Sequence, residues 1–169
     1  TVGHTGFSNR FAQAYDEWKN WQPEQAAQIR DSIGKRLEFY HNSLKIARAH
    51  PLTGTGTGSF STVYADHVAG TAMAPTENPH NEYINIAVQL GVIGVLALLY
   101  IFYCEWRYAA ALPLAHERHL ARGLVITFVI GCLFNSLLMD HVEGLFFAWA
   151  SGLLFAGLKS PQNSGASSQ

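Results

Sequence analysis

The chain has 169 residues, enough for one ordinary domain, and 49% of them are hydrophobic while only 14% are charged. Soluble domains usually carry about a quarter charged residues, so this composition points to a membrane-embedded part. The net charge of −1 provides no basic surface for a nucleic acid, and we expect no nucleic-acid partner. Two cysteines, Cys104 and Cys132, are too few for a disulfide framework or a zinc site.

The charged residues gather in the first half of the chain. Residues 1–83 hold seven of the eleven Lys and Arg and eight of the twelve Asp and Glu, whereas residues 84–158 are mostly apolar. The first twenty residues contain no apolar segment of the kind that a signal peptide needs. Delivery of the polar half out of the cytoplasm would need earlier transmembrane helices, and we expect such helices before residue 1.

Two helices are expected at the start of the polar half. Aromatic residues at positions 7, 11, 15 and 18 share one helix face, which either packs on its neighbours or places Trp18 and Trp21 at a membrane interface. A second helix begins at Pro23, because apolar residues then recur every three or four positions, and Pro51 ends it. Its apolar stripe consists of Ile29, Ile33, Leu37, Tyr40, Leu44 and Ala47.

Alternate glycines form the loop that follows. Gly54, Gly56 and Gly58 allow the backbone to approach a ligand or another backbone segment closely. The Gly-Lys-Ser/Thr ending of a P-loop does not follow, so a tight turn between helices is the favoured interpretation. A short helix at 59–68 and a loop at 69–79 are expected next.

Three membrane spans are expected in the apolar half, at about 84–106, 121–139 and 143–158. The first is long enough to cross a bilayer, and Tyr100 and Trp106 lie toward its far end, as in an aromatic belt. The second and third reach membrane length only with their flanking residues. A buried hairpin of a soluble helical protein is the alternative, which the length of the first apolar segment argues against.

The arginines after the first span give the expected orientation. Arg107, Arg118 and Arg122 make that loop cytoplasmic by the positive-inside rule. Residues 1–83 then form a periplasmic helical loop domain. Residues 159–169, rich in Ser, Gly and Gln, form a disordered cytoplasmic tail.

Two polar clusters lie at the expected membrane boundaries. The first is Asn78–Tyr83, where Asn81 can cap the helix that follows, and on spacing alone a polar helix start is the favoured interpretation. The second holds Asp140, His141 and Glu143 between the last two spans. Ionisable residues at membrane depth are candidate functional residues, although a solvated connecting loop is the simpler explanation for this second cluster.

Three segments resemble the signature of the O-antigen ligase and polymerase superfamily, in matching order and separation. They are Arg36–Tyr40 in the second helix, Pro51–Phe60 in the glycine loop and Asn78–Gly94 at the start of the first span. The resemblance covers about residues 30–155. It implies an all-α, GT-C-like fold, that is, a polytopic α-helical membrane enzyme of the bacterial inner membrane with a large periplasmic loop near its C-terminus.

The resemblance also implies a reaction. Members move a glycan from an undecaprenyl diphosphate carrier to an acceptor hydroxyl, within membrane lipids and with no metal, cofactor or nucleotide sugar. Ligases use the lipid A–core oligosaccharide of lipopolysaccharide as acceptor, polymerases use another repeat unit, and a related branch uses protein serine or threonine. We favour the ligase, and a non-catalytic transport or scaffold protein is the rival from another class.

The chemistry selects residues within the resemblance. The diphosphate leaving group needs its charge neutralised, which suits a guanidinium, and the acceptor hydroxyl must lose a proton, which suits an imidazole. We therefore predict His80 as the general base and Arg36 as the diphosphate ligand. One base and an in-line displacement would invert the anomeric carbon. The other candidate substrate contacts are Lys35, Gly56, Gly58, Asn81, Glu82, Asp140 and His141.

Overall fold

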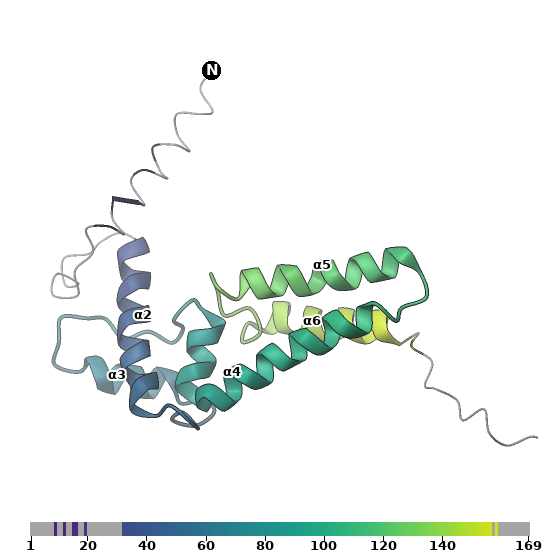
Figure 1. Cartoon of the computed structure of the whole chain (residues 1–169). Coiled ribbons are helices and arrows are strands. Elements are labelled where there is room, and N and C mark those ends of the chain that lie inside the picture. Colours follow the sequence, from purple (N-terminus) through teal and green to yellow (C-terminus); the bar gives the residue numbers. More distant parts are fainter. Residues whose placement is uncertain are drawn as a thin grey trace, which may run out of the picture. The chain divides into compact units, whose positions relative to one another are not determined.

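The computed structural model describes residues 9, 12, 15, 16, 19, 32–156 and 158. Trp18, Trp21, Pro23 and the tail 159–169, for which the sequence makes predictions, lie outside these residues. From residue 32 onward the described residues form five helices joined by loops, without a strand (Figure 1), as expected of an all-α protein. Of the described residues, those up to Leu96 together with Leu133–Ser136 form one compact unit, and the others form a second.

The first unit is built on α2 (Ser32–Ala49), α3 (Phe60–Val68) and the first turns of α4 (Glu82–Ala109). α2 and α3 lie side by side (Figure 1). The helices predicted at 23–50 and 59–68 are therefore confirmed where the structure describes them. The apolar core of this unit consists of Ile46 from α2, Phe60, Tyr64 and Val68 from α3, and Val88 from α4.

The buried face of α2 is more polar than the sequence pattern predicted. Glu38, Asn42 and Ser43 are buried, and the side-chain amide of Asn42 donates to the sulfur of Met73 at 3.1 Å. Leu44, a member of the expected apolar stripe, is instead exposed. The stripe prediction is wrong at this position because the inward face of α2 follows Glu38, Asn42 and Ile46, one turn apart from each other.

We expect Glu38 to lower stability at neutral pH. Its side chain is 5% exposed, and one carboxylate oxygen has no hydrogen-bond partner. Burial raises the pKa of Glu38, although the charge of Lys35 acts in the opposite direction. A raised pKa in the folded state favours the protonated acid, so stability is present at acid pH and is lost as pH rises through that pKa. Ionised Glu38 at pH 7 is thus a destabilising group.

Glu38→Gln should therefore stabilise the fold by about 1 kcal/mol at pH 7 and change little at pH 4. Thermal unfolding of the purified wild type and variant at both pH values measures the two differences. The same stabilisation at both pH values would show that the carboxylate charge is not the cause.

The glycine loop packs against a break in α4. At Gly91 the backbone adopts φ 64° and ψ −159°, which interrupts the helix. The break leaves backbone N–H and carbonyl groups of α4 without their helical partners, and the loop provides replacements. The N–H of Val92 donates to the carbonyl of Pro51 at 2.8 Å, and the N–H of Thr55 donates to the carbonyl of Val88 at 2.9 Å. The first expected span is found as α4, with a break that the apolar pattern did not indicate.

Glycine is required where these two backbone segments cross. A Cβ at Gly91 would lie 2.4 Å from the carbonyl carbon of Leu52, and a Cβ at Gly54 would lie 2.3 Å from that of Gln89. Both glycines also have a positive φ. Gly54 therefore allows close approach to another backbone segment, one of the two uses that the sequence suggested for this loop.

Gly91→Ala should destabilise the protein by about 2–5 kcal/mol, because its φ and ψ suit only glycine and the added Cβ would meet backbone atoms. Gly123→Ala in α5 (Ala115–Gly131) is the matched control, since nothing lies within 4 Å of a Cβ there. We expect the control to be neutral or stabilising by up to about 1 kcal/mol. Thermal unfolding of both purified variants in one detergent compares them, and equal melting temperatures would contradict the account.

The second unit comprises the end of α4, α5 and α6 (His141–Phe155), and α5 and α6 run side by side (Figure 1). Phe147 of α6 packs against Phe102 of α4 and Phe128 of α5, with ring centroids 5.9 and 4.6 Å away. The guanidinium of Arg118 donates to the carbonyl of Leu112 at 2.8 Å and so fastens the loop between α4 and α5. Aromatic packing and this loop contact hold the three helices together.

One helix within residues 32–156, α4, is long and apolar enough to cross a membrane. α6 is apolar but has 15 residues, fewer than the span expected at 143–158. α5 ends at Gly131, and residues 132–140 are non-helical, so the helix stops before the end of the span expected at 121–139. The chain leaves the helix there because Asn135 and Ser136 hydrogen-bond to residues just before α4.

Candidate functional site

The first turn of α4 is fixed by Asn81, as the sequence predicted. The side-chain oxygen of this residue accepts from the N–H of Ile84 at 3.0 Å, which satisfies a free donor of the helix start. Its side-chain nitrogen donates to the carbonyl of Leu133 at 3.0 Å. Asn81 is buried, and both ends of its amide are bound within the protein. Its observed role is thus to cap α4 and to bind the 133–136 segment.

His80 lies immediately before this cap in a left-handed backbone conformation, with φ 55°. Such a conformation is uncommon for a residue with a side chain and persists only where neighbours hold it. The side-chain oxygen of Asn78 accepts from the N–H of His80 at 2.7 Å. The hydroxyl of Tyr40, on α2, donates to the carbonyl of His80 at 3.1 Å. Two side chains therefore fix the backbone from which the imidazole projects.

The imidazole of His80 is half-buried and has neighbours on α2 and in the segment 133–136. Its Nδ1 lies 3.2 Å from the side-chain oxygen of Asn135. The ring of Phe39 lies 6.4 Å away, measured between centroids. Ser136, which follows Asn135 in the chain, donates a hydrogen bond from its hydroxyl to the side-chain oxygen of Asn78 at 2.8 Å. The segment 133–136 thereby packs on the turn that carries His80.

Arg36 lies one helical turn before Tyr40 on α2, with an exposed side chain. Burial raises the pKa of the Tyr40 hydroxyl, and the positive charge of Arg36 acts in the opposite direction, as does a hydrogen bond from Asn81. The charge of Arg36 thus affects the pKa of Tyr40, and the Tyr40 hydroxyl bonds directly to the backbone of His80. The two predicted catalytic residues share this neighbour.

A comparison with protein families adds independent information on this arrangement. A family model described as O-antigen ligase matches residues 5–99, more than half of the chain. The chain belongs to the O-antigen ligase family. It is therefore a member of a membrane-associated family of glycosyltransferase-like enzymes of the O-antigen ligase or polymerase type, which use polyprenyl-linked glycans and lipid acceptors. Comparisons with curated proteins and with solved structures gave no match.

The matched region of this O-antigen ligase family member contains both Arg36 and His80. It also contains the remaining candidates of the first unit. Lys35 is exposed on α2, and Glu82 is buried in the first turn of α4. The N–H groups of Gly56 and Gly58 both bind Gln89, through its carbonyl and its side-chain oxygen respectively. These two amides are engaged within the protein.

Asp140 and His141 belong to the second unit and start α6. The carbonyl of Asp140 accepts from the N–H of Gly144 at 2.9 Å, in the first turn of the helix. The side chain of His141 is exposed. Within the part of the chain that the structure describes, no group of three or more His, Cys, Asp or Glu side chains is placed to hold a metal ion.

Sequence reasoning missed Tyr40, Asn135 and Ser136 as parts of the His80 surroundings. Tyr40 was included in the apolar stripe and in the family-like segment 36–40, but it was given no role at the site. Asn135 and Ser136 fell inside the span expected at 121–139, where polar side chains are costly unless they bind a partner. Two adjacent polar residues inside an otherwise apolar segment were the available signal.

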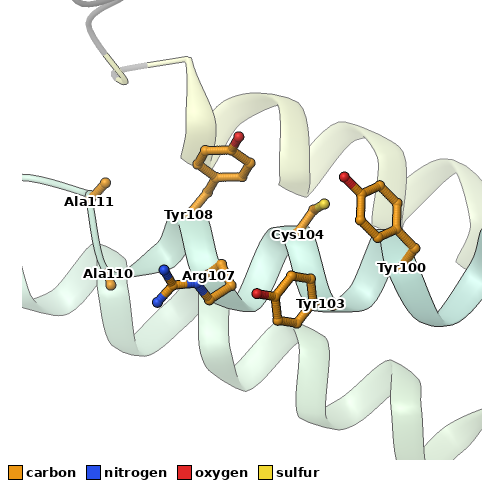
Figure 2. A pocket seen from close by; sticks show the side chains of 7 residues that line it. All are labelled: Tyr100, Tyr103, Cys104, Arg107, Tyr108, Ala110 and Ala111. Atoms are coloured by element: carbon orange, nitrogen blue, oxygen red, sulfur yellow. The ribbon is translucent and has the colours of Figure 1, made fainter.

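A surface hollow of about 530 Å³ lies on the second unit. Figure 2 shows the side chains that line it. Most of its lining comes from the last turns of α4, where Arg107 lies among tyrosines. The complete lining is Tyr100, Tyr103, Cys104, Arg107, Tyr108, Ala110 and Ala111. Aromatic rings with hydroxyl groups beside a cation are typical of the headgroup level of a membrane. None of the predicted site residues lines this hollow.

Proposed function

We propose that this protein transfers O-antigen glycan from undecaprenyl diphosphate to the lipid A–core oligosaccharide at the periplasmic face of the bacterial inner membrane. His80 acts as general base and Arg36 binds the diphosphate. The observation that carries the proposal is that Tyr40 bonds to the backbone of His80 and that Arg36 lies one helical turn before Tyr40 on α2, where its charge acts on the pKa of the Tyr40 hydroxyl.

The proposed chemistry divides between the two side chains. Nε2 of His80 takes the proton from the acceptor hydroxyl as its oxygen attacks the anomeric carbon. The bond from that carbon to the diphosphate oxygen breaks, and the diphosphate leaves with the additional negative charge. The Arg36 guanidinium donates hydrogen bonds to it as the charge develops, which lowers the barrier. Attack opposite the leaving group inverts the anomeric configuration.

The membrane placement is part of the proposal. We assign the apolar helices α4, α5 and α6 to the membrane region and residues 1–83 to the periplasm. The end of the segment at 121–139, from residue 132 on, lies at the periplasmic boundary, because residues 133–136 bind the turn that carries His80. The exposed apolar side chains of α4, α5 and α6 support this assignment, because contact of these side chains with water would cost much free energy. Arg107 and its tyrosine neighbours then lie at the cytoplasmic headgroups.

The acceptor is tested with the purified full-length protein in lipid nanodiscs. Undecaprenyl diphosphate glycan is supplied with lipid A–core, with a second carrier-linked repeat unit, or with a serine- and threonine-containing acceptor protein. We expect transfer to lipid A–core, seen as a mass increase of one glycan. Transfer only to the repeat unit or only to the protein would reassign the chain to a polymerase or a protein transferase. No transfer to any acceptor would overturn the enzymatic proposal.

A further inference from the structure

Asn135 and His80 are 55 residues apart in the chain and lie in direct contact in the first unit. The side-chain oxygen of Asn135 is 3.2 Å from Nδ1 of the imidazole. An amide oxygen only accepts hydrogen bonds, so this contact requires the proton of a neutral imidazole to be on Nδ1. The other nitrogen, Nε2, then carries the lone pair that a base needs. The contact therefore selects the tautomer as well as the ring orientation.

The segment that carries Asn135 is anchored on both sides of it. Before it, the carbonyl of Leu133 accepts from the buried amide of Asn81 at 3.0 Å. After it, the fully buried Ser136 donates to the side-chain oxygen of Asn78 at 2.8 Å. Asn78 accepts in addition from the N–H of His80 at 2.7 Å. One side chain thus connects the backbone of His80 to the segment that holds Asn135 in place.

We infer that Asn135 is a positioning residue for the general base: its amide oxygen holds the Nδ1–H tautomer of His80 and so presents Nε2 to the acceptor hydroxyl. This rests on the proposed role of His80. Asn135 touches neither substrate in this role and acts through the imidazole alone. Ser136 and Asn78 contribute indirectly, by fixing the segment and the turn against each other.

Substitutions at 135 separate positioning from mere packing. Asn135→Leu keeps the size but removes the acceptor, and we expect kcat to fall about 10- to 100-fold while KM for lipid A–core changes less than twofold. Asn135→Asp keeps an acceptor, so it should retain most of the activity at high pH. Its negative charge also favours the protonated imidazole, and the acidic limb of the pH–rate profile should move up by about one pH unit.

The charged and titratable side chains on the elements next to His80 stay the same in these variants. They include Arg36 and Tyr40 on α2 and Glu82 in the first turn of α4. Ser136→Ala is the comparison variant, because it loses one hydrogen bond that anchors the segment but keeps the Asn135 acceptor. We expect its melting temperature and its kcat to fall, because the segment is held less firmly, while the acidic limb of its pH–rate profile keeps the wild-type position.

The measurements are initial transfer rates between pH 5.5 and 9 with full-length protein in nanodiscs, using undecaprenyl diphosphate glycan and lipid A–core. The inference is overturned if Asn135→Leu keeps the wild-type kcat, or if Asn135→Asp is as inactive as Asn135→Leu. An unchanged acidic limb in Asn135→Asp would also overturn it. His80→Ala is measured alongside: if that variant is fully active, the proposed function of His80 fails, whereas loss of activity in His80→Ala with active Asn135→Leu refutes only the role of Asn135.

Discussion

Replacement of His80 by alanine should lower the rate of glycan transfer by about 10²- to 10⁴-fold, because the acceptor hydroxyl loses its proton acceptor. The rate is measured with purified full-length protein, saturating undecaprenyl diphosphate glycan and lipid A–core. His67→Ala is the matched control, since His67 is exposed in the last turn of α3 and is not one of the predicted site residues. The control should transfer glycan at the wild-type rate.

The alternative for His80 is a purely structural role at the start of α4. Its backbone conformation, with hydrogen bonds to Asn78 and Tyr40, suits such a role. A His80→Ala protein that is as stable as wild type and equally active would establish that role and remove the general base from the mechanism. Comparison of melting temperatures keeps a folding defect separate from a catalytic one.

Loss of Arg36 should have the second largest effect. Arg36→Ala is expected to lower kcat about 10²- to 10³-fold, because the leaving diphosphate then develops its charge without a guanidinium donor. Arg36→Lys should recover part of this loss and stay about tenfold below wild type, since lysine supplies charge but not two parallel hydrogen bonds. Arg48→Ala, an exposed arginine in the last turn of the same helix, is the control and should be fully active.

The proposed role of Arg36 fails if the two alanine variants, Arg36→Ala and Arg48→Ala, transfer glycan at the same rate. An Arg36→Lys protein with full wild-type activity would show that a positive charge at this position suffices and that the planar guanidinium geometry does not contribute. Both comparisons use the same nanodisc preparation and donor concentration, so that differences in rate reflect the side chain at position 36.

Local patterns in the sequence were sufficient to predict α2, α3 and α4, but not the end of α5 at Gly131. The repeat of apolar residues and the position of Pro51 predicted α2, and apolar length predicted α4. The break at Gly91 was beyond such reasoning, because it is stabilised by hydrogen bonds to the distant residues Pro51 and Thr55. Leu44 was misassigned for a similar reason: which face of α2 is buried depends on the position of α3.

The candidate site divides in the same way. His80 and Arg36 were selected by the chemistry of diphosphate displacement and by family resemblance, which both depend on residue type and order. Tyr40 and Asn135 approach His80 only through tertiary packing, over 40 and 55 residues of chain. Gly56 and Gly58 were predicted to contact substrate, but the sequence could not show that Gln89 binds the N–H groups of both glycines. The order of residues in the sequence does not show which N–H groups are already hydrogen-bonded within the folded protein.

The most direct test of the central claim is complementation in bacteria that lack their own O-antigen ligase. Full-length wild type and His80→Ala are expressed at equal membrane abundance, verified by blot, and lipopolysaccharide is displayed on a gel. We predict that wild type restores the long-chain ladder and that His80→Ala leaves only lipid A–core. A ladder from both proteins would contradict the assignment of His80, and no ladder from wild type would contradict ligation to lipid A–core.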